Sequence, residues 1–542
     1  MDKDTAPMNS TLPPSRASRR LFLQHSSAMG MLAGAGAPMA LNLLAAGSAA
    51  AQAAPDYKAI VCLFLFGGND SFNMVLPTDG HNGPGAPTPG SSWNAYTATR
   101  NQAPDSIALL APGVMADGGA AVGSPARLGG VLPLSALNAN GLNNSRSFAL
   151  HPMLGSLQAL FNTDRRLAIV PNVGPLLRPT TKTQFGQISH PKPASLFSHN
   201  DQQNTWQAMA AEGATRGWGG RMGDALAAMN SRTVFTSISA SGNAVWLAGQ
   251  TVQQYQVSSG GAIRMGADSN GRLYGSTVVA DALQRIAGSS RSNHVFERDL
   301  AGISARSVDA ETTLRSALRA PSDALFGTAP ASGTYNAAND PKLRYLNPLT
   351  GQQTANGLAQ QLQVVARLID AGISGATGAR RQVFFVSLGG FDTHDLQNRN
   401  HADLMARLNQ ALSYFDTTLG AMGARNNVTL FTASDFGRTF TSNGDGTDHG
   451  WGSHHLVMGG AVRGGDLYSR FPTLGVKNAN NNNFDSSPNQ LGNGSMLPET
   501  SVDQLGATLG RWFGCSDSAL ADIFPNLANF DVGRRNLGFM AA

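Results

Sequence analysis

Residues 59–66 read AIVCLFLF and are followed directly by GGND at residues 67–70. An uninterrupted apolar run that ends sharply at two glycines is typical of a strand buried on both faces of a parallel sheet. In an open parallel sheet, ligands bind beyond the carboxyl ends of the strands. This stretch therefore predicts a central strand with a functional loop at its end.

The rest of the chain alternates between expected strands and helices, which is the pattern of an α/β fold. We expect a doubly wound, mostly parallel sheet with helices on both faces. The expected strands cover 59–66, 167–170, 234–239, 383–388 and 428–431. The expected helices cover 154–161, 198–209, 358–369, 403–419 and 501–513, with a further helical layer at about 275–320.

One α/β domain is expected over residues 54–542, because this alternation begins after residue 54 and continues to the end of the chain. Long loop and helical insertions are expected at about 78–147, 250–345 and 472–498. The first is rich in Gly, Pro, Asn and Ala, a composition typical of a surface insertion.

The N-terminal segment has the features of an export signal. Residues 18–24 read SRRLFLQ and precede a long uncharged run, rich in Ala and Gly, that ends in small residues at Ala51 and Ala53. Paired arginines, a weakly apolar run and an A-x-A site are typical of a twin-arginine signal, so we expect cleavage near Ala53 and export in the folded state by the Tat translocase. The mature protein would be periplasmic or secreted, without a stable membrane anchor. The alternative is an uncleaved anchor helix.

The charge pattern argues against nucleic-acid binding. The formal net charge is +5, only 13% of the residues are charged, and no cluster of Lys and Arg with interleaved aromatics occurs. Cys62 and Cys515 are too few and too far apart for a disulfide scaffold. We expect Cys62 to be a buried thiol, and a bridge between the two cysteines is the alternative.

Acidic and histidine residues follow three of the expected strands, where a shared site would lie. These are the segments 67–73, 389–395 and 434–438, and the segment 448–455 adds three histidines. Carboxylates and imidazoles that meet at one sheet edge suit a divalent metal, zinc or manganese better than calcium. Each motif also has a structural interpretation: Asp70 could be a turn residue and Arg438 a salt-bridge partner. Arg438 could otherwise bind a substrate anion.

The motifs together resemble the bacterial family called domain of unknown function 1501. They are the arginine pair at 19–20, GGNDSFN at 67–73, SHND at 198–201, GGFDTH at 389–394, SDFGRT at 434–439, TDHGWG at 447–452 and the closing stretch 498–514. That family is in turn similar to the superfamily of alkaline phosphatases, sulfatases and cofactor-independent phosphoglycerate mutases. The resemblance implies an alkaline-phosphatase-like fold and a site for two metals.

Carried over position by position, the resemblance implies metal ligands at Asp70, Asp392 and Asp435. It implies a histidine ligand at His449, with His454 as the alternative, and a nucleophile at Ser198. Two departures matter: Asp435-Phe436 stands where the superfamily has an Asp-His pair, and Asp392-Thr393-His394-Asp395 replaces its D-x-x-x-H spacing. The site would then hold one metal, or be completed by His394 or Asp395.

The expected function is that of an exported, metal-dependent hydrolase acting on phosphate or sulfate esters of small molecules or polymers. The divalent ion would be zinc, manganese or calcium, in one or two copies. A serine hydroxyl attacks at neutral pH only when a metal or a base lowers its pKa, and a helix N-terminus further stabilises the oxyanion. The alternatives are that Ser198 only caps its helix, and that the chain is a non-catalytic binding or surface-assembly protein.

Overall fold

Strand β1 (Lys58–Phe66) lies in the middle of a nine-stranded sheet in the computed structural model. The structure describes residues 56–80, 91–268, 271–290, 293–481 and 483–541. The strand order is β16-β5-β15-β12-β1-β11-β6-β7-β8. The other strands of this sheet are β5 (Leu167–Gly174), β6 (Ser237–Ser239), β7 (Gln254–Ser258), β8 (Gly261–Ala262), β11 (Arg381–Gly389), β12 (Val428–Ser434), β15 (Ser453–Gly459) and β16 (Thr500–Ser501).

The sheet is mostly parallel. Strand β1 pairs in parallel with β11 on one side and with β12 on the other, and β6 and β7 continue the parallel order. Strand β15 runs antiparallel to both β12 and β5, and β8 runs antiparallel to β7. The predicted α/β class with a mostly parallel sheet is therefore confirmed.

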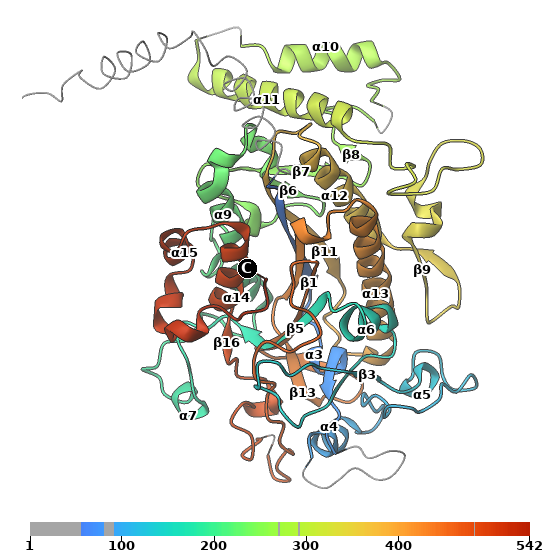
Figure 1. Ribbon diagram of the computed structural model, residues 1–542, viewed down its shortest axis with the longest axis vertical. Helices are drawn as coiled ribbons and strands as arrows, with labels where there is room; N and C mark the ends of the chain where they lie inside the picture. Colours follow the sequence, from blue (N-terminus) through green and yellow to red (C-terminus); the bar gives the residue numbers. More distant parts are fainter. Residues whose placement is uncertain (1–55, 81–90, 269–270, 291–292, 482, 542) are drawn as a thin grey trace, which may run out of the picture. The chain divides into compact units, whose positions relative to one another are not determined.

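Helices cover both faces of the sheet, as Figure 1 shows. Because successive side chains of a strand point to opposite faces, Val61 and Leu63 of β1 join one core, whereas Cys62 and Phe64 join the other. The first core includes α6 (Gly155–Asn162), α12 (Gly357–Ile373) and α13 (Gln397–Ala421). The second includes α8 (His199–Ala208), α9 (Trp218–Leu226), α14 (Val502–Phe513) and α15 (Asp517–Ile523).

Smaller elements surround the sheet. A three-stranded sheet has the order β2-β4-β3, and two-stranded ribbons join β9 with β10 and β13 with β14. Their bounds are β2 (Val75–Pro77), β3 (Leu132–Leu134), β4 (Phe148–Leu150), β9 (Arg344–Leu346), β10 (Gln353–Ala355), β13 (Arg438–Ser442) and β14 (Thr447–His449). The remaining α-helices are α3 (Ser71–Met74), α4 (Ser92–Arg100), α5 (Pro125–Leu128), α7 (Lys182–Phe185), α10 (Thr277–Ala287) and α11 (Val295–Ala317).

Part of the predicted insertion at about 78–147 is buried in the protein, namely helix α4. Helix α4 buries Trp93, Tyr96 and Arg100, and the two aromatic rings pack in a separate core with Phe72 and Phe440. The two aromatic side chains suffice to bury this helix, because one aromatic residue removes as much apolar surface from water as several small ones, whereas residues 113–122 are mostly exposed. As a consequence, Arg100 at the end of this helix is buried beside Asp70, which follows β1.

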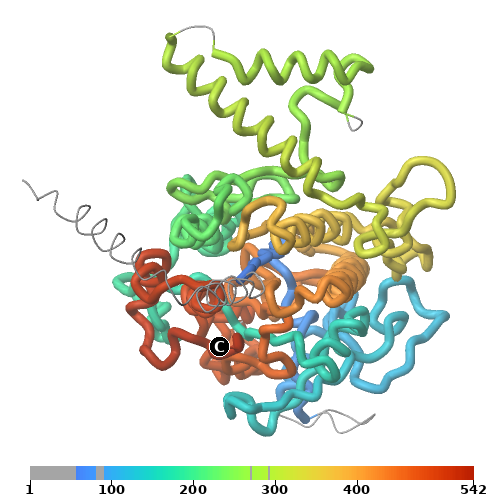
Figure 2. Tube along the Cα trace, turned by 45° about the horizontal axis from the view of Figure 1, so that its top comes forward, coloured from blue at the N-terminus to red at the C-terminus, as the bar shows by residue number. Residues whose placement is uncertain are grey.

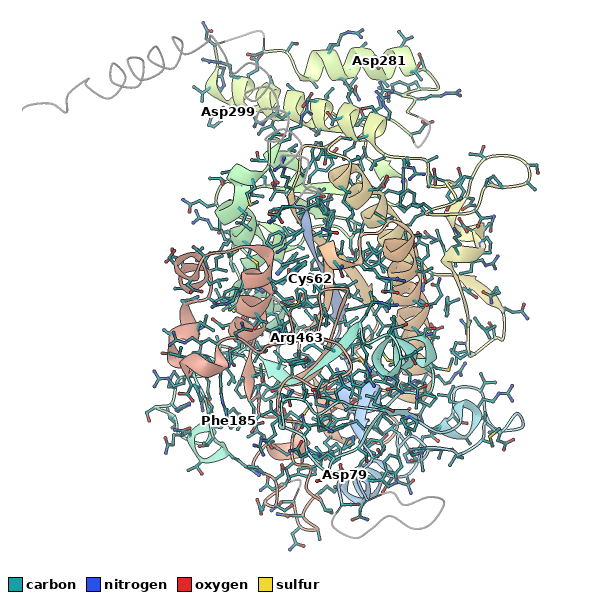
Figure 3. All side chains as sticks on the ribbon, viewed as in Figure 1. Cys62, Asp79, Phe185, Asp281, Asp299 and Arg463 are labelled. Carbon is teal, nitrogen blue, oxygen red and sulfur yellow. The ribbon has the colours of Figure 1, made fainter. Side chains whose placement is uncertain are left out.

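Residues 57–542 form one compact unit. Both cysteines are free and buried, and Cys62 lies within the sheet (Figure 3). The predicted export signal at residues 1–53 lies outside the described residues and stays a prediction. Within the described part of the chain, no helix is long and apolar enough to cross a membrane.

Candidate metal centre

The loops after β1, β11 and β12 meet at the carboxyl end of the sheet because two glycines let them approach. Gly67 and Gly68 have φ of +112° and +82°, which L side chains rarely adopt. A Cβ on Gly67 would lie 2.3 Å from the backbone nitrogen of Asp392, and one on Gly68 would lie 2.4 Å from the ring of Phe436. The GG pair of the opening motif therefore brings the three strand ends together.

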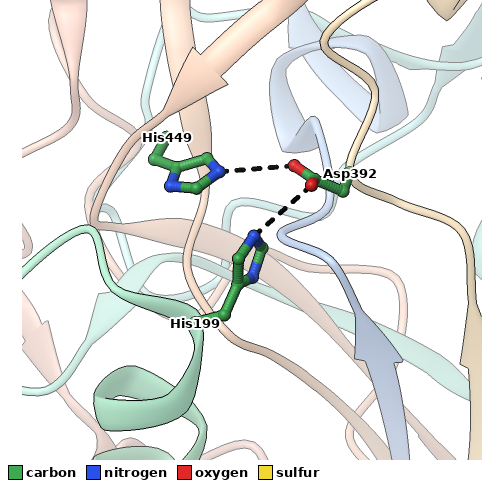
Figure 4. Close-up of side chains that lie close together, drawn as sticks. All are labelled: His199, Asp392 and His449. Carbon is green, nitrogen blue, oxygen red and sulfur yellow. Dashed lines mark ion pairs between the residues drawn. The ribbon is translucent and has the colours of Figure 1, made fainter.

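Asp392 is the centre of the site, and Figure 4 shows two of the imidazoles that face it. Its Oδ1 lies 3.3 Å from Nε2 of His449 and 3.1 Å from Nε2 of His394. The two Nε2 atoms are 3.0 Å apart. The other oxygen, Oδ2, lies 3.5 Å from Nε2 of His199. One carboxylate thus contacts three imidazoles that come from separate parts of the chain.

The protein fixes the orientation of two of these rings. Nδ1 of His199, the first residue of α8, lies 2.7 Å from Oδ2 of the buried Asp435. Nδ1 of His449, the last residue of β14, donates to the backbone oxygen of Phe197 at 2.7 Å. When these rings are neutral, their protons sit on Nδ1, and both Nε2 lone pairs point toward Asp392. Metal-ligating histidines are held in this way by a carboxylate or a carbonyl group.

A phenylalanine ring lies beside both imidazoles. The centroid of the buried Phe436 ring is 4.8 Å from that of His199 and 4.6 Å from that of His449. Phe436 thus supplies a packing contact at this position, and no nitrogen donor. The ring limits the positions that the two imidazoles can take.

The electrostatics of the two rings differ. The hydrogen bond with Asp435 raises the pKa of His199, against the opposing effect of burial. Burial lowers the pKa of His449, so that ring is neutral at neutral pH. For Asp392, burial alone would raise the pKa, but the hydrogen bond and charge of Arg438 outweigh it and the net pKa is lowered. The carboxylate is therefore ionised.

The arrangement fits a divalent metal. Ligand atoms of His199, Asp392 and His449 all lie within 4.8 Å of one another. The 3.0, 3.1 and 3.3 Å separations among His394, His449 and Asp392 are close to the edge of a ligand tetrahedron, about 3.3 Å for bonds of about 2.0 Å. Without a proton or a cation between them, the acceptor atoms of His449 and Asp392 would repel each other. Mixed nitrogen and oxygen ligands favour zinc or manganese.

Arg438 is fully buried, and its guanidinium group is committed to the protein. It donates to Oδ1 of Asp392 at 2.6 Å and to the backbone oxygen of Gly67 at 3.2 Å. It also donates to the backbone oxygen and the hydroxyl of Thr447. The sequence allowed Arg438 to be either a salt-bridge partner or a binder of a substrate anion. In the structure it is the salt-bridge partner of Asp392 and has no exposed surface.

Three residues predicted as metal ligands lie outside this cluster. Both oxygens of the buried Asp70 are paired with Arg100, at 2.6 and 2.9 Å, and Oδ2 also accepts from Gln397. Asp435 accepts from Gly67 N, His199 and Gln203, and so acts through His199. His454 lies buried on β15, accepts from the backbone N–H of Asn172, and has its pKa lowered by burial to about 3.

Ser198 is the N-cap residue of α8, as expected, but its side chain makes no capping hydrogen bond. It is half-buried and immediately precedes His199. The residue before it, Phe197, has φ of +73° and supplies the carbonyl group that orients His449. Ser198 therefore lies between the two residues that help to build the site, Phe197 and His199, and its hydroxyl is not engaged in capping.

Sequence reasoning missed two residues of the site region. The SHND motif contains His199, but the sequence analysis assigns a role only to its neighbour Ser198. The first residue of a helix can enter a site as readily as the N-cap residue. Arg100 lies in the segment assigned to a surface insertion. Trp93 and Tyr96 in the same helix are the feature of the sequence that could have indicated its burial.

We predict that Arg100→Met destabilises the protein by about 3–5 kcal/mol, because it leaves the buried carboxylate of Asp70 without its partner. The double variant Asp70→Asn/Arg100→Met should recover a large part of this loss. Chemical denaturation of the two variants and the wild type measures the effect. Equal stability of Arg100→Met and the wild type would mean that Asp70 has another cation.

We also predict that the purified protein binds one zinc or manganese ion per chain. Asp392→Asn, His199→Ala and His449→Ala should each weaken binding about tenfold or more, since each removes a ligand. Isothermal titration calorimetry of metal into chelator-treated protein gives both the affinity and the stoichiometry. The matched control is His294→Ala, an exposed histidine that lies outside the cluster. Binding that survives all three substitutions would place the metal elsewhere.

Comparison with known proteins gives a family match and several distant structural likenesses. No curated protein matches the sequence. The solved structure of Ps i-CgsB in complex with k-i-k-neocarrahexaose is similar with a TM-score of 0.29 and 9% identity, over 71% of this chain and 72% of that one. A TAB5 alkaline phosphatase mutant with Mg bound in its M3 site has a TM-score of 0.22 and 8% identity, over 55% of this chain and 82% of that one.

Alkaline phosphatase from the Antarctic bacterium TAB5 is similar with a TM-score of 0.22 and 9% identity, over 60% of this chain and 88% of that one. At such TM-scores these likenesses support no inference about the chemistry. The family comparison covers the part of the chain that contains β11, β12 and β14. Residues 334–524 match the family described as protein of unknown function (DUF1501), which confirms the resemblance for the motifs in that part of the chain, at 389–394, 434–439, 447–452 and 498–514.

Proposed function

We propose that this chain is an exported, metal-dependent hydrolase of phosphate or sulfate esters. The observation that carries the proposal is the pair of imidazoles, His199 and His449, whose Nδ1 atoms contact protein acceptors and whose Nε2 atoms face the carboxylate of Asp392. His449 is neutral and turns a nitrogen acceptor toward the ionised carboxylate, whereas the raised pKa of His199 lets that ring carry a proton and pair with Asp392 until a cation replaces the proton. A site that binds a cation needs this arrangement.

The residues of the chain have distinct tasks in this proposal. Asp392, His394, His449 and His199 would hold the ion, which when bound would lower the pKa of an oxygen nucleophile and neutralise charge that develops on the ester. Asp435 and the carbonyl group of Phe197 keep the imidazoles oriented. Arg438 keeps Asp392 ionised through its hydrogen bond and charge.

Ser198 is the proposed nucleophile. It adjoins the ligand His199 in sequence and stands at the N-terminus of α8, where the backbone N–H groups favour an oxyanion. Its freedom from capping leaves the hydroxyl available for attack. A water molecule attacking directly is the other route to the same products, and Ser198→Ala separates the two.

One ion is expected, and not two. A second ion would need the carboxylates of Asp70 and Asp435, and both are already committed. Asp70 is neutralised by Arg100, and Asp435 accepts hydrogen bonds from His199, Gln203 and Gly67. The guanidinium group of Arg100 thus supplies a fixed positive charge to the same end of the sheet.

The second candidate function is that of a non-catalytic binding or surface-assembly protein on the same fold. The burial of Arg438 favours it, because the arginine that was expected to hold a substrate anion has no exposed surface. The metal would then be a structural ion that ties the three loops together. The two functions differ in turnover.

We predict that the purified, metal-loaded protein hydrolyses an aryl phosphate or an aryl sulfate, and that chelation abolishes the reaction. Asp392→Asn and His199→Ala should each lower kcat/KM about a hundredfold or more, because each removes a ligand of the ion. Ser198→Ala should do so without loss of bound metal. His294→Ala serves again as the control.

Two outcomes of this assay would count against the hydrolase. Turnover that is unchanged by chelation would exclude metal dependence. Bound metal without turnover of either ester class would favour the non-catalytic function. In both cases the metal content of each variant is measured alongside the rate, so that loss of the ion and loss of chemistry are separated.

For export, we predict that Arg19→Lys/Arg20→Lys retains the full-length precursor in the cytoplasm, because the translocase recognises the arginine pair. Fractionation of cells that produce the wild type and the variant measures this. The wild type should appear outside the cytoplasm, shortened by about the length of the predicted signal. Equal distribution of both proteins would contradict the twin-arginine assignment.

A further inference from the structure

Helices α10 and α11 expose an unusual number of large apolar side chains. Figures 1 and 2 show the two helices side by side, beyond the end of the sheet formed by β7 and β8. Phe296 is 78% exposed, Leu300 is 65% exposed and Val278 is 69% exposed. The exposed apolar residues of this hairpin are Tyr274, Val278, Val279, Ile286, Val295, Phe296, Leu300 and Ile303. None of the residues of the metal centre belongs to it.

The hairpin buries small or polar side chains between its own helices. The buried residues of α10 are Ala280 and Gln284, and those in the first half of α11 are Ala301 and Ser304. The large apolar residues are therefore outside and the small ones inside. Exposed apolar clusters of this kind mark interaction surfaces on soluble proteins.

The exposed residues lie on one face at the spacing of a helix–helix seam. Phe296, Leu300 and Ile303 of α11 are separated by four and three residues, and Val279 and Ile286 of α10 are separated by seven. Intervals of three, four and seven residues place side chains on one stripe of a helix, as in the a and d positions of coiled coils. Each helix thus presents a stripe that can pack against another helix.

The charges beside the α11 stripe are self-complementary. Asp299 and Arg306 are seven residues apart, lie on the same flank of the stripe, and have opposite signs. If two α11 helices pack antiparallel about a twofold axis, Leu300 of each copy lies opposite Ile303 of the other. Asp299 of each copy then lies near Arg306 of the other, so both charge pairs form at once. Twofold contacts of this kind are self-complementary by construction.

We propose that the α10–α11 hairpin is a dimerisation surface, whose partner is the same hairpin of a second copy of this chain. The two hairpins form an antiparallel four-helix bundle that covers the apolar stripes of all four helices. The proposal does not depend on the hydrolase function, since the hairpin and the metal centre share no residue.

The charge balance of the hairpin favours a second copy over a membrane surface. Residues 274–317, which include both helices, hold five acidic residues (Asp281, Glu297, Asp299, Asp309 and Glu311) and five basic residues (Arg285, Arg291, Arg298, Arg306 and Arg315). A helix that lies on an anionic membrane has an excess of Lys and Arg on its polar face. Acids that equal the bases are suited to pairing between protein helices. Figure 3 marks Asp281 on α10 and Asp299 on α11.

The test is the molar mass of the purified protein, measured by size-exclusion chromatography with light scattering over a range of concentrations. The wild type should have the mass of a dimer. Leu300→Glu/Ile303→Glu should have the mass of a monomer, with unchanged metal content and thermal stability, because both side chains are exposed within one chain. The control Ile188→Glu, at a fully exposed position outside the hairpin, should stay dimeric.

A charge exchange tests the antiparallel twofold arrangement itself. Asp299→Arg and Arg306→Asp should each weaken the dimer about tenfold, because each replaces two attractive contacts with two repulsive ones. The double variant Asp299→Arg/Arg306→Asp should dimerise as the wild type does, since both pairs are restored with their signs reversed. If Asp299 and Arg306 only stabilised the fold of one chain, the double variant would not regain the dimer.

Four outcomes would overturn the proposal. They are a monomeric wild type, a dimer that persists in Leu300→Glu/Ile303→Glu, a double charge variant that remains as weak as the single ones, and a monomer that sediments with phosphatidylglycerol vesicles. The last outcome would assign the apolar face to lipid.

Discussion

The carboxylate of Asp392 lies between a buried guanidinium group on one side and three imidazoles on the other. Arg438 holds Oδ1 at 2.6 Å and lowers the pKa of the carboxyl group, so the charge is present before any ligand arrives. The histidines come from α8, from the loop after β11 and from the end of β14. Their convergence depends on Gly67 and Gly68, because a side chain at either position would force these loops apart.

A second buried charge pair stands at the same end of the sheet with a different effect. Arg100 neutralises Asp70, and a chain of hydrogen bonds continues through Gln397 and Thr447 to Arg438. Each of the two aspartates that follow β1 and β11 thus has its own arginine. In this arrangement Asp70 has an internal partner in Arg100, whereas the second oxygen of Asp392 faces only His199 among the described residues. Of the one or two ions expected from the sequence, this favours one.

Much of the fold followed from hydrophobic patterning, because long apolar runs leave a strand few alternatives. Strand β1 and helices α12, α13 and α14 occur where they are expected, and the place of Asp392 and His394 follows from the rule that ligands lie beyond strand ends, whereas His449 followed from the family resemblance. Patterning could not show that Asp70 would meet Arg100, since their contact depends on a helix without a strong apolar stripe. It also could not choose between Ser198 and His199, because their directions depend on the positive φ at Phe197.

The central proposal is that Asp392 and its imidazoles hold a metal. Anomalous X-ray scattering from crystals soaked in zinc or manganese tests it directly. We expect one strong peak within about 2.0–2.3 Å of Oδ1 or Oδ2 of Asp392 and of Nε2 of His449, with His394 or His199 completing the ligands. A site without a peak at saturating metal, or a peak beside Asp70, Asp435 or His454, would contradict it.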